Sequence, residues 1–192
     1  GMAFFFFFFF FFITPSASAV DLDFRFKDGY CQKAKAPGTN PEFFGECGNL
    51  TKSRFINKSF TDLNLLGGVF NSSYFYVTQI EGGNLSHASF RRSVLMQTSF
   101  RNATAEKMDV RGSHFKSVDF SNSKLPYFFA TGTRFTKVNF RGCNLQNANF
   151  WGSLLQEVNF EGADLRGANL SRTFLLFAQL KGAQFDDKTQ LP

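Results

Sequence analysis

An apolar residue returns at every fifth position of this chain from Leu50 to Phe185, without a slip. All 28 positions of the series are apolar, including the small residues Ala105 and Ala130. A helix repeats its buried face about every 3.6 residues and a half-buried strand repeats it about every 2, so neither element accounts for this period. A fixed period instead predicts a stack of similar units, each of which buries its apolar residue against its neighbours.

The residues around each apolar centre also recur. A small side chain commonly stands two positions earlier, Asn or Asp commonly stands directly before the centre, and Gly often follows one or two positions later. Two residues that are two apart on an extended segment point the same way, so the small and the large side chains both face inward. Asn, Asp and Gly favour turns. Each unit is therefore predicted to be a short extended side followed by a corner.

Three stretches show this pattern without deviation: 148–152 (Ala-Asn-Phe-Trp-Gly), 163–167 (Ala-Asp-Leu-Arg-Gly) and 168–172 (Ala-Asn-Leu-Ser-Arg). They resemble the pentapeptide-repeat family, and the resemblance covers about 140 of the 192 residues. It implies an all-β fold, a right-handed four-sided β-solenoid of about seven coils of 20 residues. We expect the β-helix over residues 48–187, a short N-terminal cap or linker over 20–47, and a C-terminal tail over 188–192.

The spacing of 20 can be tested on the residues themselves, because stacked coils should give each side its own chemistry. One small inward column carries a hydroxyl in every coil: Ser53, Ser73, Ser93, Ser113, Thr133, Ser153 and Thr173. We expect these hydroxyls to bond to neighbouring coils or to the backbone. Four residues break the small-residue rule and are expected to mark bulges or looser coils: Lys58, Leu63, Met108 and Phe128.

The N-terminus resembles a secretory signal. Nine consecutive Phe, Phe4 to Phe12, precede Ala17-Ser18-Ala19, a site of the small-x-small type that signal peptidase cuts. The run is too short to span a bilayer, which needs about 20 apolar residues. Residues 1–19 are thus interpreted as a signal-like segment, which leaves no transmembrane anchor after cleavage. The absence of Lys or Arg before the run keeps a truncated or misassigned N-terminus open as the alternative.

The cysteines fall into two groups. Cys31 and Cys47 flank a polar loop that contains Pro and Gly, and in an exported protein they could form a disulfide. In a reducing compartment they would be free thiols. Cys143 falls in a small inward column, so we interpret it as a buried apolar residue rather than a nucleophile.

No set of residues indicates catalysis. His87 and His114 are the only histidines, and the repeat places both outward, on different sides. No Cys, His and Asp cluster has metal-ligand spacing, and no phosphate-binding loop or nucleophile motif occurs. We therefore predict no catalytic residues, no metal, no cofactor, no small-molecule substrate and no enzyme activity.

One side of the solenoid is predicted to carry an apolar strip on its outer surface. It is the side with the hydroxyl column, and the other three sides show mostly polar residues outward. Its members are Ile56, Tyr74, Tyr76, Val77, Val94, Met96, Leu154, Phe174, Leu176 and Phe177. Lys116, Arg134 and Lys137 interrupt the strip in the middle. A continuous apolar strip favours either cover by residues 20–47 or an interface with another protein or a second copy.

A small basic patch is predicted on the adjacent side, formed by Arg91, Arg92 and Arg111 with Asp109 nearby. Three arginines could hold one phosphate or sulfate group. We interpret the patch first as an ordinary solvated face, and an anion site is the alternative.

The prediction for function is a structural or protein-interaction module that binds through one face of the β-helix. The signal-like segment favours export, to the periplasm, the cell exterior or the thylakoid lumen. The alternative is a nucleic-acid-related regulator, because one branch of the family resembles DNA in shape and charge and inhibits gyrase. Such a mimic should be strongly negative, whereas this chain has a net charge of +6, so nucleic acid is the less favoured partner.

Overall fold

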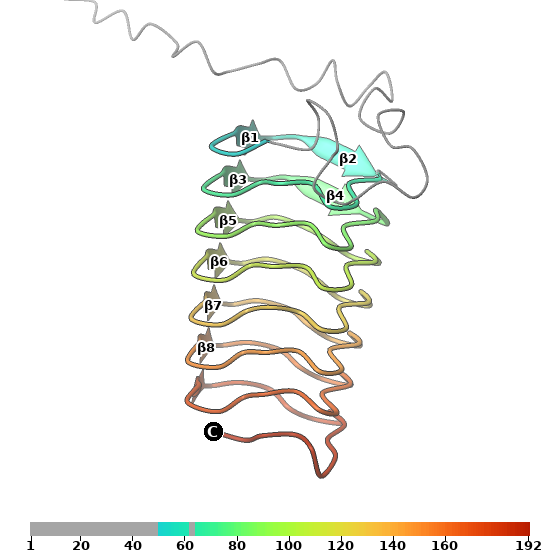
Figure 1. Ribbon diagram of the computed structural model, residues 1–192, viewed down its shortest axis with the longest axis vertical. Coiled ribbons are helices and arrows are strands. Elements are labelled where there is room, and N and C mark those ends of the chain that lie inside the picture. Colours follow the sequence, from blue (N-terminus) through green and yellow to red (C-terminus); the bar gives the residue numbers. More distant parts are fainter. Residues whose placement is uncertain (1–49, 62–63) are drawn as a thin grey trace, which may run out of the picture.

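The computed structural model describes residues 50–61 and 64–192, and the regular elements in that part of the chain are all short β-strands (Figure 1). Seven of them form one parallel sheet: β1 (Arg54–Ile56), β3 (Tyr74–Tyr76), β5 (Val94–Met96), β6 (His114–Lys116), β7 (Arg134–Thr136), β8 (Leu154–Gln156) and β9 (Phe174–Leu176). The strands β2 (Ser59–Thr61) and β4 (Gln79–Glu81) form a second, two-stranded parallel sheet. The segment 1–19, the cap 20–47 and the pair Cys31 and Cys47 lie outside the described residues.

The coils pair at a spacing of 20 residues. Phe55 pairs with Phe75 in the long sheet, and isolated bridges keep the same spacing on the other sides, as between Asn84 and Thr104. The isolated bridges fall into three series and the long sheet supplies a fourth, one every five residues, so each coil has four sides. This confirms the four-sided β-solenoid. We name the sides by the coil 73–92: face 1 is 73–77, face 2 is 78–82, face 3 is 83–87, face 4 is 88–92, and other coils follow in steps of 20.

The corners explain the choice of residue at the fifth position. That residue has a positive φ in coil after coil, as in Gly142 (64°) and Asn122 (60°). Gly adopts this left-handed conformation without strain and Asn tolerates it. At most corners after faces 2, 3 and 4, the N–H of the residue three positions after a centre donates to the carbonyl of that centre, for example Cys143 N to Phe140 O at 3.1 Å. In the coils from Phe75 to Leu175 the corner after face 1 has no such bond, and among the described residues face 1 alone continues as three-residue strands through seven coils.

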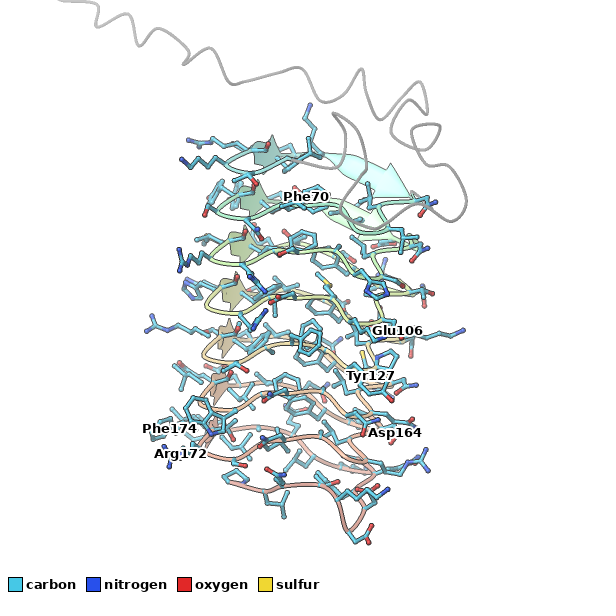
Figure 2. All side chains as sticks on the ribbon, viewed as in Figure 1. Phe70, Glu106, Tyr127, Asp164, Arg172 and Phe174 are labelled. Atoms are coloured by element: carbon cyan, nitrogen blue, oxygen red, sulfur yellow. The ribbon has the colours of Figure 1, made fainter. Side chains whose placement is uncertain are left out.

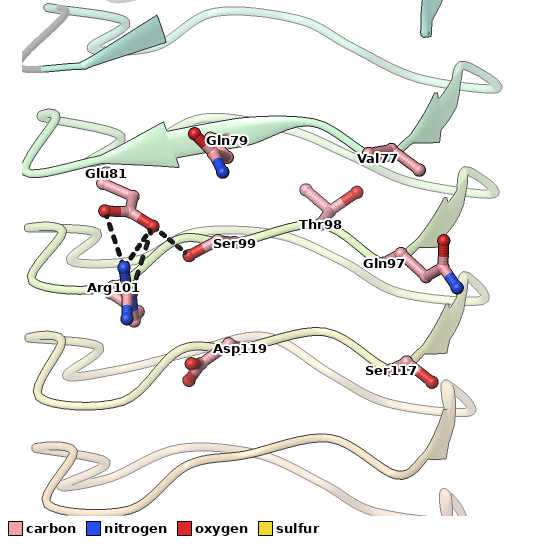
Figure 3. A pocket seen from close by; sticks show the side chains of 9 residues that line it. All are labelled: Val77, Gln79, Glu81, Gln97, Thr98, Ser99, Arg101, Ser117 and Asp119. Atoms are coloured by element: carbon pink, nitrogen blue, oxygen red, sulfur yellow. Dashed lines mark hydrogen bonds and ion pairs between the residues drawn. The ribbon is translucent and has the colours of Figure 1, made fainter. Parts of the chain in front are cut away.

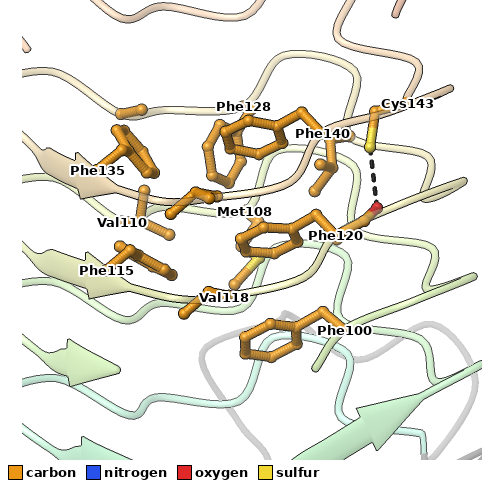
Figure 4. Packing of buried hydrophobic residues seen from close by; sticks show 14 of the residues in the cluster. Phe100, Met108, Val110, Phe115, Val118, Phe120, Phe128, Phe135, Phe140 and Cys143 are labelled. Carbon is orange, nitrogen blue, oxygen red and sulfur yellow. Dashed lines mark hydrogen bonds between the residues drawn. The ribbon is translucent and has the colours of Figure 1, made fainter. Parts of the chain in front are cut away.

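Stacked phenyl rings fill the core (Figure 4). The centres of face 2 from Phe100 to Phe160 form a column whose successive rings lie 4.9, 5.2 and 5.4 Å apart, with interplanar angles of 8°, 10° and 8°. Rings of the opposite face 4 meet this column edge-on, as Phe128 does with Phe120. The interior of the rod thus takes up 12 of the 30 Phe of the sequence.

The hydroxyl column bonds between coils, as expected. The hydroxyl of Ser113 donates to Phe90 O at 2.6 Å, and it accepts from Ser93 N at 3.0 Å. The same donation recurs one coil on, from Thr133 to Val110 O at 2.9 Å. A buried hydroxyl at this position thus satisfies backbone groups that an alanine would leave with fewer partners.

The expectation of bulges at the large inward residues is wrong. Met108 and Phe128 are fully buried, and the bridges beside them keep the spacing of 20. The centres two positions later are small, Val110 and Ala130, where two other coils of face 4, at 88–90 and 148–150, combine Ala with Phe. Total volume is conserved within the side, so the backbone does not deviate. The register of 20 also holds on both sides of Lys58, and Leu63 lies outside the described residues.

Candidate interaction surfaces

All ten residues of the predicted apolar strip lie on the outer side of face 1 or on the corner that follows it. Exposure is greatest at the C-terminal end, where Phe177 is 84% exposed and Phe174 is 65% exposed. Figure 2 shows Phe174 on the side of the long sheet, opposite Tyr127 and Asp164. At the N-terminal end of the strip the side chains partly bury one another, since the Tyr74 hydroxyl donates to the Met96 sulfur at 3.9 Å. The face thus has two apolar zones, an N-terminal zone (Ile56, Tyr74, Tyr76, Val77, Val94 and Met96) and a C-terminal zone (Leu154, Phe174, Leu176 and Phe177).

The middle of face 1 is basic, as predicted. Lys116 and Arg134 are exposed on neighbouring coils, and His114 lies half-buried between them. Burial lowers the pKa of His114, and the charges of Arg134 and Lys116 lower it further. The lowered pKa favours the neutral form of His114, so the positive charge of this region comes from Lys116, Arg134 and Lys137, the last of which pairs with Glu157 at 3.7 Å.

The corner after face 1 carries apolar residues at a conformational cost. Val77 has a φ of 50° and Phe177 has a φ of 56°. A left-handed conformation is uncommon for any residue other than Gly and is rarest for β-branched or bulky ones, at about 1–2 kcal/mol. Both side chains are also exposed to solvent. A positive φ recurs at the corners of all four faces, so it is the exposed apolar side chains that make the corner after face 1 part of the candidate site.

A shallow pocket of about 320 Å³ adjoins the N-terminal zone at the corner between faces 1 and 2 (Figure 3). It is lined by Val77, Gln79, Glu81, Gln97, Thr98, Ser99, Arg101, Ser117 and Asp119. Arg101 donates to both oxygens of Glu81 at 2.9 and 3.1 Å, and the Ser99 hydroxyl donates to Glu81 at 2.7 Å. The Glu81 charge is thereby paired, and the pocket extends the strip with polar groups.

The predicted arginine patch is organised by one carboxylate on face 4. Asp109 accepts from Arg91 Nε at 2.6 Å and from Arg111 Nε and Nη2 at 2.9 and 2.6 Å. Burial opposes ionisation of Asp109, but the hydrogen bonds from Arg111 and Arg91 outweigh it and lower its pKa. The arginines are thus fixed in position and one of their charges is neutralised. Arg92 is exposed at the adjacent corner and forms no ion pair with the described residues.

Three exposed aromatic residues escaped the sequence reasoning. Tyr127, Phe129 and Trp151 are each about two-fifths exposed on faces 3 and 4. Each has a cation over its ring: Lys107 over Tyr127 at 5.8 Å, Arg111 over Phe129 at 5.8 Å and Arg172 over Trp151 at 5.5 Å. The repeat does place Phe129 and Trp151 at outward positions, so counting columns would have found them.

The residues that the structure describes form no cluster of side chains suited to catalysis or metal binding. Within residues 50–61 and 64–192 there is no cluster of His, Cys, Asp and Glu that could hold a metal, and no helix long and apolar enough to cross a membrane. His87 is exposed at a corner of face 3, away from His114 on face 1. Cys143 is buried, which raises the pKa of its thiol to about 12, and its sulfur contacts Phe120 O at 2.9 Å.

A family model described as pentapeptide repeats matches the chain in eight copies, over residues 81–116, 113–152 and 152–187. These ranges together span more than half of the 192 residues. No curated protein sequence matches the chain significantly.

Solved structures with the same kind of coil are distant in sequence. A trypsin-treated form of QnrB1, a plasmid-mediated fluoroquinolone resistance protein, is 21% identical with a TM-score of 0.49, covering 72% of this chain and 83% of its own. The pentapeptide repeat protein Rfr23 of the cyanobacterium Cyanothece is 23% identical with a TM-score of 0.34, covering 75% and 88%. HetL of Nostoc, involved in heterocyst differentiation regulation, is 22% identical with a TM-score of 0.34, covering 72% and 87%.

Proposed function

The chain belongs to the pentapeptide-repeat family, and from that premise we propose that it is a non-enzymatic interaction module that binds a protein partner through face 1. The observation that carries the proposal is the apolar strip on the one face that continues as a sheet through seven coils. Apolar side chains as exposed as Phe177 and Phe174 gain most when a partner removes them from water. The anchor of the interface is the C-terminal zone: Leu154, Phe174, Leu176 and Phe177.

The charge of the rod supports this function over the DNA-mimic alternative. A protein that imitates DNA needs an excess of carboxylates on its surface, whereas the chain has 21 Lys and Arg against 15 Asp and Glu. An interface with a protein needs no such excess.

The first experiment measures mass in solution by light scattering coupled to size exclusion. It compares the wild type with the double variant Leu176→Asp/Phe177→Asp and with Leu191→Asp, an apolar residue that is 63% exposed but lies off face 1. A wild-type dimer that becomes a folded monomer only in the double variant identifies the partner as a second copy. A folded monomer in all three excludes self-association through the C-terminal zone.

A photo-crosslinking side chain at position 177, with position 191 as the control, then identifies what covers the strip. A link to another protein that the Leu176→Asp change abolishes supports the proposal. A link within the chain to residues 20–47 means that the strip is covered by its own N-terminal segment, and the proposal fails.

Export remains a proposal of its own, based on the signal-like segment 1–19 and on the possible Cys31–Cys47 disulfide. N-terminal sequencing of the protein recovered from its natural host tests it. A mature chain that begins at Val20 supports export, and an intact N-terminus in the cytoplasmic fraction refutes it.

A further inference from the structure

The net positive charge of the rod lies on two adjoining faces. Among the described residues up to Asp187, faces 4 and 1 carry nine cations, Lys52, Arg54, Arg91, Arg92, Arg111, Lys116, Arg134, Lys137 and Arg172. They carry only two carboxylates, Asp109 and Glu157, for a net charge of +7. Faces 2 and 3 carry seven cations and seven carboxylates, for a net charge of 0. Basic residues do occur on all four sides, but carboxylates balance them on only two.

Ion pairs among the described residues occur on all four faces, but on faces 4 and 1 they engage only three of the nine cations, Arg91, Arg111 and Lys137. On faces 2 and 3, Arg101 pairs with Glu81 at 2.9 Å, Arg141 with Glu161 at 3.6 Å and Arg166 with Asp164 at 2.7 Å. On face 4 the one carboxylate, Asp109, is shared by two arginines, and the face keeps a net charge of +4. A one-sided field of this kind orients a molecule on an extended anionic surface.

Face 4 also presents side chains suited to a lipid–water interface. Trp151 and Phe129 stand outward on this face, with the guanidinium groups of Arg172 and Arg111 over their rings. Trp is enriched at membrane interfaces because its ring is amphipathic, and Arg can keep its charge in the headgroups while its stem lies along apolar surface. Face 4 thus combines interfacial aromatics with cations in coils along the rod.

The corner between faces 4 and 1 is smooth in the middle of the rod. Its residues there are Gly112, Gly132 and Gly152, and a Cβ at Gly132 or Gly152 would have no neighbour within 4 Å. Cations stand at the same corner on both sides of this stretch, Arg92 before it and Arg172 after it. A flat surface can therefore approach the backbone between two cationic ends.

We propose that face 4, together with its corner to face 1, docks the rod on a membrane that contains anionic lipids. Each basic residue near such a surface strengthens binding about fivefold. Nucleic acid fits less well, because binders of single strands use a basic groove with free ring faces for stacking. The pocket described above lies between faces 1 and 2, away from face 4. On face 4 the rings of Phe129 and Trp151 already have guanidinium groups over them, so they are not free to stack on bases. This docking leaves the strip on face 1 free, so it goes beyond the proposed function and does not depend on it.

The experiment uses the full chain with phosphatidylcholine vesicles, with and without about one-third phosphatidylserine. Binding is measured by vesicle sedimentation, and Trp151 provides a second readout because it is the only Trp of the chain. Arg92→Gln/Arg172→Gln removes two charges from face 4. The matched control Arg141→Gln/Lys181→Gln removes two charges from the opposite face 2. All variants keep the run Phe4–Phe12, so any binding by that run is common to them.

We expect the phosphatidylserine vesicles to bind the wild type at least about tenfold more strongly than phosphatidylcholine alone, with binding that weakens as salt rises. The face 4 variant should bind about 25-fold more weakly, and the face 2 control less than about threefold. The emission of Trp151 should shift to the blue on binding and be quenched by brominated lipids. Thermal unfolding of each variant confirms that the fold is intact.

Three results overturn the proposal. They are equal binding to both vesicles, an equal loss in the face 2 control, and binding that leaves the emission of Trp151 unchanged. A larger loss in Lys116→Gln/Arg134→Gln would assign the docking to face 1 instead. Tighter binding of an oligothymidylate than of the vesicles, measured by fluorescence anisotropy, would replace the membrane by nucleic acid.

Discussion

Replacing Phe120 by Ala removes the ring at the centre of the phenyl column. Phe120 is fully buried, with Phe100 and Phe140 stacked on its two sides at 4.9 and 5.2 Å. The coils above and below are held by backbone hydrogen bonds, such as Phe120 N to Asn139 O at 2.8 Å, so the cavity cannot readily collapse. Loss of a buried Phe costs about 3–5 kcal/mol, and a site that stays open lies at the upper end. We expect the free energy of unfolding to fall by about 5 kcal/mol.

Two further variants separate volume from ring stacking. Phe120→Leu keeps most of the side-chain volume but loses two stacked contacts, each of which contributes about 0.5–1.5 kcal/mol, so we expect a loss of about 1–3 kcal/mol. Phe177→Ala removes a ring that is 84% exposed, and its effect should stay within about 0.5 kcal/mol.

The assay is equilibrium unfolding in urea, followed by circular dichroism and by the fluorescence of Trp151. A loss below about 2 kcal/mol for Phe120→Ala would falsify the claim that the column is closely packed and rigid. An equal loss for the Ala and Leu variants would mean that ring geometry, and not the cavity, determines the effect.

Three more predictions concern single groups. Ser113→Ala should lower the free energy of unfolding by about 1–2 kcal/mol, because the buried Phe90 carbonyl loses a donor, whereas Ser117→Ala at an exposed corner should change it by less than about 0.5 kcal/mol in the same urea assay. The folded-state pKa of Asp109 is lowered, so its stabilisation is present above its unfolded pKa of about 3.9 and is lost as the pH falls through the folded value. Unfolding midpoints measured below pH of about 4 should therefore decline more steeply for the wild type than for Asp109→Asn, and parallel curves would contradict this account. The thiol of Cys143, with its pKa raised to about 12 by burial, should resist iodoacetamide in the native protein and react in denaturant, as peptide mass spectrometry can determine.

The architecture could be derived from the sequence because its period is a property of the chain alone. A centre such as Phe115 or Leu145 can be buried only if every fifth residue points inward, and the hydroxyl column repeats only at a spacing of 20. The same count separates inward from outward residues, so it placed the ten strip residues on one face. The burial of Cys143 followed from its column for the same reason.

The effect of an exception to the pattern could not be derived in this way. Met108 and Phe128 break the small-residue rule, and a one-dimensional pattern cannot show that Val110 and Ala130 make room for them. Packing is decided by the summed volume of side chains that meet inside the coil. The result is an undisturbed register in place of the expected bulges.

Surface chemistry depended on tertiary structure because it is decided by distances between side chains. The sequence shows three arginines near Asp109, but only the folded face has Arg91 and Arg111 sharing that carboxylate while Arg92 stays apart from it. Likewise, the cations over Phe129 and Trp151 arise from how successive coils stack. The repeat alone determines which residues face outward, and the geometry between coils 20 residues apart decides which of them meet, because charge pairing and ring contacts act over a few ångströms.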